Sequence, residues 1–370
     1  MRIIAFILFS CLFICCKSEY SEIDNTSELK LKWNKSHQDD SINRAVIGLQ
    51  WALSYVGSNT PCNSKSIKVS GNIITIYPDY VGLNNKALAV FKTLISKIKQ
   101  TEAFKNNNTL DLGRFITLLL ASPEHYYALV GTPKTLEQLK AKYKLNAQKG
   151  YVNNSSVALQ DRIISFSDLK DLNQLWISEE IDSISKTIYE LETIELLKNG
   201  QLRFGIYNKN GILKNVANSK HTAAGKPGKC IWCHESNLNQ MFKKQDNVYG
   251  FLSADALQQK IKASRDTFKR KRKLLKETVD FNKKQQHTFT EILYISFLEP
   301  SAKRLSLEWN INEDEVVKSL KHLKTHKHKE FQFLGDLYYR KDVEQFAPLK
   351  AIKVSSSVRE LSANEINHLN

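Results

Sequence analysis

The feature that most constrains this chain is the pentapeptide Cys230-Ile231-Trp232-Cys233-His234, which places two thiols and an imidazole within five residues. On a helical turn, residues three and four positions apart are neighbours on one face. A helix here would therefore set the two cysteines side by side, with the histidine directly next to them. The rest of the chain must then fold so that a space remains in front of these three side chains.

The pentapeptide resembles the C-x-x-C-H haem-attachment motif of c-type cytochromes and matches it at each defined position. The resemblance covers five residues and implies a cofactor, one covalent haem c, without implying a fold. It implies that Cys230 and Cys233 form thioethers with the haem and that His234 is the proximal iron ligand. The function that it implies is electron transfer by an exported mono-haem cytochrome.

Three other interpretations of the cysteine pair stay open. A structural zinc site would need two more ligands, and His221 or Cys62 could supply them. A redox-active disulfide would sit at a helix start in a thioredoxin-like unit, although no βαβ pattern precedes the pair. The third interpretation is a chance pair on the surface.

The second axial ligand decides what the haem is used for, and His221 is the candidate that the sequence favours most. It precedes a loop at 223–229 that contains two glycines and a proline, so the chain could fold back over the distal side of the haem. His221 is therefore the expected distal iron ligand. The same position would also suit a histidine that faces solvent.

Other side chains are weaker candidates for the iron. Met241 lies seven residues after His234, which is about 10 Å along one helix face, so we expect it to pack in the core unless the helix breaks. His125 stands beside two tyrosines that could wall a haem pocket, although a core position is expected. Lysines interleave with three further histidines, which we expect on a solvated basic surface: His322, His326 and His328.

Two alternatives to an electron carrier follow from these observations. A haem enzyme or sensor with an open distal site, peroxidase-like in its chemistry, would use the length beyond a minimal cytochrome domain. A cofactor-free envelope lipoprotein would follow if the haem interpretation fails. Whether the protein is an enzyme stays open, because the acidic pair Glu179-Glu180 is expected on a solvent-facing helix and no catalytic group stands out.

The N-terminus predicts export. A positive start, Met1-Arg2, precedes an apolar run at 3–15 that is too short to span a bilayer, which is typical of a signal peptide at 1–15. The cysteines at its end resemble the lipobox of bacterial lipoproteins. Cys16 is the expected lipidation site, and Cys11 is the alternative. A plain cleaved signal peptide and an uncleaved anchor stay open as other interpretations. We expect the periplasmic side of the bacterial envelope, with the membrane reached through a lipid anchor.

The formal charge of +16 indicates acidic partners. An acidic redox partner protein or acidic lipid headgroups would be attracted to such a chain. Nucleic acid is not an expected partner, because the chain is predicted to be exported and carries no nucleic-acid motif.

The fold class expected from the sequence is mainly α with a few short β-hairpins, with the haem site between a central hairpin region and helices. A polar tether at 16–40 precedes a mainly helical region at 41–150, a haem-attachment region with a hairpin at 151–250, and a mainly helical C-terminal region at 251–370. Alternating apolar residues predict hairpins at 67–77 and 202–213. Apolar spacing predicts helices at 87–98, 110–121 and 230–242, and Asn312 with Glu315 forms a capping box.

Overall fold

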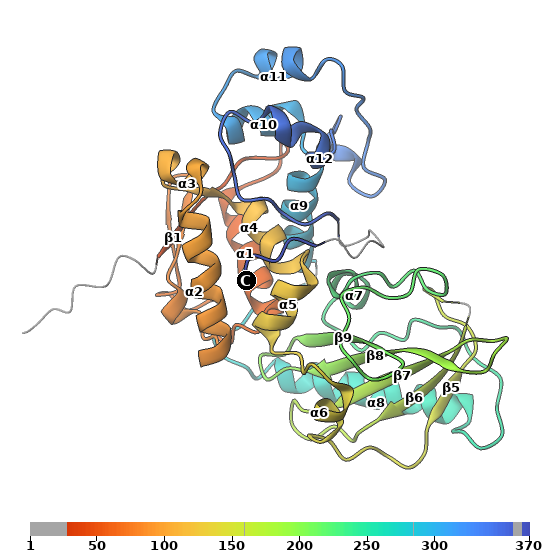
Figure 1. The fold of residues 1–370 in the computed structure, drawn as a ribbon. Helices are drawn as coiled ribbons and strands as arrows, with labels where there is room; N and C mark the ends of the chain where they lie inside the picture. The colour runs from red at the N-terminus through yellow and green to blue at the C-terminus, as the bar shows by residue number, and fades with distance from the viewer. Residues whose placement is uncertain (1–27, 159, 284, 358–364) are drawn as a thin grey trace, which may run out of the picture.

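The computed structural model describes residues 28–158, 160–283, 285–357 and 365–370, and it sets a helical part with a small sheet beside a five-stranded sheet (Figure 1). The predicted signal peptide at 1–15 and the predicted lipidation site, Cys16, lie outside the described residues. Within the described residues, every helix is too short or too polar to cross a membrane.

The small sheet is built around the predicted hairpin. Its strands are β1 (Leu29–Lys32), β2 (Ile67–Ser70), β3 (Ile73–Ile76) and β4 (Leu110–Asp111), in the order β2-β3-β1-β4. The hairpin of β2 and β3 is confirmed, with Ile67 opposite Ile76. Its turn at 71–72 contains Gly71, whose φ of 61° a glycine adopts without strain.

Helices from both ends of the chain pack beside this sheet. The N-terminal ones are α1 (Ile42–Tyr55), α2 (Asn85–Lys99), α3 (Glu102–Asn107), α4 (Leu112–Leu120) and α5 (Pro123–Val130). The C-terminal ones are α9 (His287–Leu298), α10 (Ala302–Trp309), α11 (Glu313–Leu320) and α12 (Arg340–Val343). The helix predicted at 87–98 and the Asn312 cap are confirmed, because α2 contains the first and Asn312 Oδ1 accepts the Asp314 N–H at the start of α11.

Glycine lets α9 approach α1 and α4 closely. A Cβ atom at Gly48 of α1 would lie 2.9 Å from the Phe289 carbonyl carbon, and one at Gly113 of α4 would lie 2.7 Å from the Leu293 carbonyl oxygen. Neither distance is open to a real side chain without movement of the backbone. The two glycines therefore set how tightly the distant C-terminal helix is packed into the N-terminal part.

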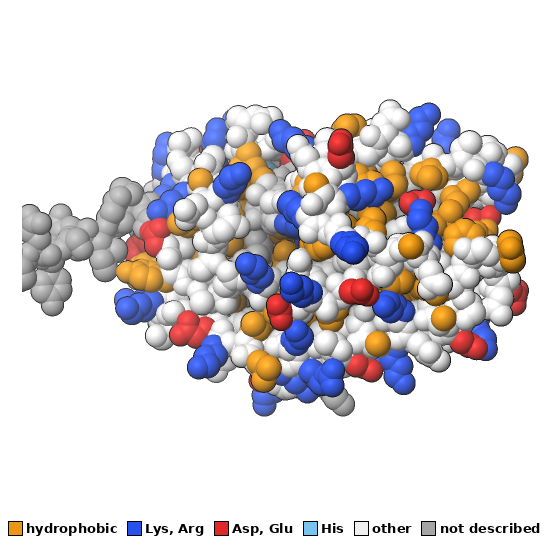
Figure 2. Space-filling view, turned by 90° about the horizontal axis from the view of Figure 1, so that it is seen from below, with side chains coloured by type: hydrophobic (Ala, Val, Ile, Leu, Met, Phe, Trp, Pro, Cys, Tyr) orange, Lys and Arg blue, Asp and Glu red, His pale blue; other side chains and the backbone are white. Residues whose placement is uncertain are grey.

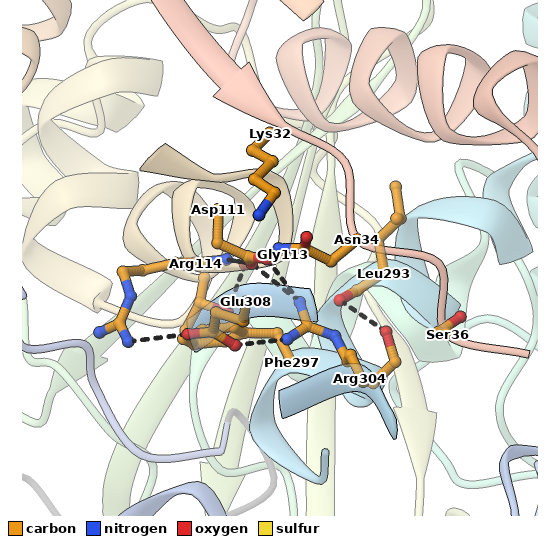
Figure 3. Close-up of polar contacts among 12 residues, drawn as sticks. Lys32, Asn34, Ser36, Asp111, Gly113, Arg114, Leu293, Phe297, Arg304 and Glu308 are labelled. Atoms are coloured by element: carbon orange, nitrogen blue, oxygen red, sulfur yellow. Dashed lines mark hydrogen bonds and ion pairs between the residues drawn. The ribbon is translucent and has the colours of Figure 1, made fainter. Parts of the chain in front are cut away.

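A buried network of ion pairs joins α4, α10 and α12. Figure 3 shows its part around Arg114, Arg304 and Glu308. Arg304 places its Nη2 atom 2.8 and 2.9 Å from the two carboxylate oxygens of Asp111, and its Nη1 donates to Glu308 at 2.6 Å. Glu308 also accepts hydrogen bonds from Arg340 and Arg114. All three guanidinium groups lie over the ring of Phe297, between 3.9 and 5.4 Å from its centroid.

The second sheet is an antiparallel meander in chain order. Its strands are β5 (Gly150–Val152), β6 (Asp161–Phe166), β7 (Leu175–Ile181), β8 (Ile188–Leu196) and β9 (Leu202–Asn208). One face packs on α6 (Leu136–Lys140) through a small apolar cluster. The other face, which carries Trp176, Ile194 and Phe204, lies toward α7 (Pro227–His234) and α8 (Ala254–Arg272).

The expected fold class, mainly α with short hairpins, is wrong. Helices make up 37% and strands 17% of the described residues, in a mixed α/β fold with sheets of four and five strands. Part of the error lies in β7, because its acidic pair Glu179-Glu180 was expected on a solvent-facing helix. Glu179 and Glu180 lie on β7, and Glu180 is completely buried because the guanidinium of Arg162 on β6 lies 2.6 Å away.

The second predicted hairpin is only partly correct. The turn after residue 208 forms, since Asn208 accepts the N–H of Gly211 at 2.8 Å. However, β9 pairs along its whole length with β8, and a single bridge joins Tyr207 to Leu213.

Candidate functional site

The Cys-x-x-Cys-His pentapeptide occupies the last turns of α7. Pro227 starts this helix in a first-turn position that needs no backbone N–H, which suits proline. Glu235 and Ser236 then adopt left-handed backbone angles, with φ of 47° and 59°, so the helix ends at His234. The helix predicted to run to residue 242 is therefore shorter, and the chain reverses directly after the histidine.

The N-terminal end of α7 is fixed by a buried ion pair. Lys226, the residue before the helix, is fully buried and forms an ion pair with Glu365 of the C-terminal segment. Its ammonium group also donates to Ser356 Oγ at 3.1 Å. The start of the pentapeptide helix is thus tied to residues far along the chain.

All three motif side chains line one cavity. Cys230, Cys233 and His234 face a space of about 1020 Å³, including the part that opens to solvent, between α7, residues 238–242 and the five-stranded sheet. Most of the wall is apolar and comes from the sheet and α8: Val152, Ile164, Trp176, Ile194 and Ile261.

The ring of His234 is held so that one nitrogen remains available. Its Nδ1 lies 3.2 Å from the carbonyl oxygen of Asn237, and because a carbonyl only accepts hydrogen bonds, Nδ1 carries the proton. The ring packs on Phe204 with centroids 5.5 Å apart, and burial lowers the pKa of the imidazole to about 4. A neutral imidazole with Nδ1 bonded to a carbonyl and Nε2 free is the usual state of a metal-bound histidine.

Neither of the two cysteines is in a disulfide bond. Burial raises the pKa of Cys230 well above its ordinary value, and the nearby carboxylate of Glu192 adds to the effect. Two cysteine side chains and an imidazole on one cavity wall form the donor set that two thioethers and an iron ligand require. The residues present therefore fit a covalent haem.

The early end of α7 brings Met241 to the same cavity. Residues 238–242 return along its wall, and the Met241 carbonyl oxygen accepts the Ser156 N–H at 2.9 Å. Met241 could approach a bound haem only if the helix ended before it, and α7 does end at His234.

The histidines proposed as iron ligands lie elsewhere. His221 is not among the residues that line the cavity; its Nδ1 is 3.7 Å from an Asp182 oxygen and its ring stacks on Tyr189, with centroids 4.4 Å apart. His125 uses both nitrogens, at 2.7 Å from the Leu118 carbonyl and 3.0 Å from the His368 N–H. Its burial lowers its pKa to about 4.

The three histidines near the C-terminus also lie away from this cavity. His326 Nε2 is 2.8 Å from Glu299, His322 lies against Phe346, and His328 accepts the N–H groups of residues 330 and 331.

Sequence reasoning missed the polar part of the cavity wall. Arg162, Ser178 and Glu192 come from three successive strands and line the cavity opposite the motif. Because side chains alternate along a strand, the alternation Glu-Leu-Glu at 190–192 was the available signal, whereas Trp-Ile-Ser-Glu-Glu at 176–180 does not alternate. It was missed because these segments were not assigned to strands.

Cys230, Cys233 and His234 line one cavity but are not gathered closely enough to form a metal-binding group by themselves. In the part of the chain that the structure describes, His, Cys, Asp and Glu side chains do not gather in any group of three or more that could hold an ion. Neither Cys62 nor His221, the extra ligands considered for zinc, lines the cavity. No protein-family model, curated protein or solved structure matches this chain.

Proposed function

We propose that this chain is an exported mono-haem c-type cytochrome that transfers electrons through one covalent haem. The observation that supports this proposal most is the cavity in front of α7. Two thiols and an imidazole with a free Nε2 line the same mainly apolar space, in the order of the haem-attachment motif. A haem bound there would supply a reversible one-electron change at its iron.

The chain's own residues would have distinct tasks. Cys230 and Cys233 would hold the group, and His234 would bind its iron, with the Asn237 carbonyl fixing the imidazole. We place Met241 as the second ligand in preference to His221, because Met241 lines the cavity and His221 does not. Thioether and imidazole ligands together would saturate the iron and raise its potential, which suits an electron carrier.

A second candidate function has one observation in its favour. Arg162 and Glu192 are ionisable side chains that line the mainly apolar cavity. Such groups could assist chemistry on a small oxidant if the second axial position stayed open, which would make the protein a haem enzyme or sensor.

The net charge and the N-terminal sequence support the redox partner and the cellular location that we propose. Figure 2 shows Lys and Arg side chains spread over the face that includes the second sheet, with fewer Asp and Glu side chains between them, in keeping with the net charge of +16. An acidic redox partner protein would be drawn to such a surface. A lipid on Cys16 would keep the protein at the membrane on the periplasmic side of the envelope.

Absorption spectroscopy of protein made in a periplasm with haem-attachment machinery tests the function. We expect low-spin spectra in both oxidation states and a sulfur-to-iron charge-transfer band in the oxidised protein. Met241→Ala should abolish that band and give a high-spin spectrum, while His221→Ala should keep the wild-type spectrum. A high-spin wild-type spectrum with fast reaction with peroxide would favour the enzyme, and haem-free protein would refute both functions.

A further inference from the structure

A cluster of charged side chains lies on the face of the five-stranded sheet that looks toward α7, and two of its members, Arg162 and Glu192, line the cavity. We call it the wall cluster: Arg162, Glu180, Glu190, Glu192 and Lys214. The strand register explains it, because Arg162 on β6 stands opposite Glu180 on β7, which stands opposite Glu190 on β8. Glu192 lies two residues further along β8, on the same face and opposite Ser178.

Two of the three carboxylates in the wall cluster have a cation of their own. Arg162 Nε lies 2.6 Å from Glu180, which also accepts the Ser178 hydroxyl at 2.5 Å. Lys214 Nζ lies 2.6 Å from Glu190, which also accepts the Asn218 N–H at 3.0 Å. Each of these two carboxylates is therefore held in an ion pair.

Glu192 is the third carboxylate and differs from the other two. In the described part of the chain it has no ion pair. Its Oε1, like Oε2 of Glu180, is buried without a hydrogen-bond partner. Glu192 lines the cavity, whereas Glu180 and Glu190 do not. When fully ionised, the wall cluster has three carboxylates and two cations and therefore a net charge of −1. Glu192 is the carboxylate of this cluster that lines the cavity.

We propose that Glu192 takes up a proton when the haem in this cavity is reduced and releases it on oxidation. The inference rests on the proposed function. A one-electron donor, such as a reduced redox partner protein, supplies the electron to the iron, and solvent supplies the proton to a Glu192 oxygen. The net charge of the site is then the same in the oxidised and in the reduced protein. This matters because charges interact strongly in a mainly apolar cavity.

Glu192 is assigned the proton because it lines the cavity, whereas the neighbouring acid Glu180 does not. Burial raises the pKa of Glu192 above its ordinary value; Arg162 opposes this, Glu190 adds to it and Lys214 opposes it. Burial and then Glu192 raise the pKa of Glu180 to about 8, so the two acids share the proton equilibrium. Two further ionisable neighbours are Lys229 on α7, which lines the cavity, and Tyr189 on β8, whose pKa burial raises.

The sign of the pH effect follows. Reduction removes one positive charge near Glu192, so its affinity for a proton is higher in the reduced protein. The midpoint potential should therefore fall as the pH rises between the two pKa values of the carboxyl group, by up to about 59 mV for a tenfold fall in proton concentration.

The test is the midpoint potential of the haem-loaded, full-length protein by spectroelectrochemistry from about pH 5 to pH 9. We expect a falling potential in the wild type, a pH-independent and higher potential in Glu192→Gln, and a restored slope in Glu192→Asp. Glu179→Gln is the matched control, because this neighbouring acid on β7 pairs with Lys149 and does not line the cavity. It should keep the wild-type slope.

A second measurement does not depend on the variants folding. The reduced-minus-oxidised infrared spectrum of the wild type should gain a band of a protonated carboxyl group. A pH-independent wild-type potential without that band, or an unchanged slope in Glu192→Gln, would overturn the inference and leave a haem-binding electron carrier standing. Protein without covalent haem would overturn the proposed function and this inference together.

Discussion

Replacing Glu308 by glutamine should destabilise the protein far more than a surface substitution would. Its carboxylate accepts hydrogen bonds from Arg304 at 2.6 Å, from Arg340 at 2.7 Å and from Arg114 at 3.3 Å, and 9% of its side chain is exposed. Three arginines are balanced there by Asp111, Glu308 and Glu344. Glu308→Gln leaves one buried positive charge uncompensated, which costs about 3–5 kcal/mol in comparable cases.

Urea unfolding at pH 7, followed by tryptophan fluorescence and circular dichroism, measures this loss. The matched control is Glu315→Gln, an exposed acid on the neighbouring helix α11, which should change the free energy of unfolding by less than about 1 kcal/mol. A Glu308→Gln variant within 1 kcal/mol of the wild type would refute the view that this network holds α4, α10 and α12 together.

The same network predicts an acid transition. Burial acts to raise the pKa of Glu308, but Arg340, Arg304 and Arg114 outweigh it and hold that pKa well below the ordinary value. A depressed pKa stabilises the fold above the unfolded-state pKa of about 4.3, and this stabilisation is lost as the pH falls toward the folded-state value. The stability difference between wild type and Glu308→Gln should therefore shrink below about pH 4; a constant difference would contradict the argument.

Three further predictions concern other parts of the molecule. Gly113→Ala should cost about 1–3 kcal/mol in urea unfolding, because its methyl group would meet the α9 backbone, and a neutral effect would show that α9 can move aside. Lys226→Met should cost about 3–5 kcal/mol, because it leaves the buried Glu365 without its cation, and the double variant with Glu365→Gln should recover part of that loss in the same assay. Cys62→Ser should leave the amount of covalently bound haem unchanged in a haem stain, because Cys62 does not line the cavity; loss of haem in this variant would place the cofactor elsewhere.

Local patterns in the sequence predicted the elements that local contacts stabilise. The apolar spacing of α2, the hairpin of β2 and β3, and the Asn312 cap depend on residues close together in the chain. The burial of Glu180 depends instead on Arg162 from another strand, and that of Glu190 on Lys214 from the loop after β9. Such pairing is not visible before the strands are placed, so the five-stranded sheet was missed.

The sequence predicted that the three motif side chains lie together, but it did not predict their surroundings. The spacing of the pentapeptide identified Cys230, Cys233 and His234 as one group, and the structure brings them to one cavity. The end of α7 had no sequence signal, because Glu235 and Ser236 adopt left-handed angles that usually mark a glycine. Because the end of α7 was not predicted, the return of the chain that brings Met241 to the cavity was not predicted either.

The measurement that tests the central claim most directly is the intact mass of the denatured protein after export through a periplasm with haem-attachment machinery. The account predicts a chain heavier by one haem, which a haem stain also detects on the denatured band. It predicts loss of that mass when Cys230 and Cys233 are both changed to Ala, and its retention in Cys62→Ser. A correctly exported wild-type chain with the mass of the polypeptide alone would contradict the haem site and the function proposed from it.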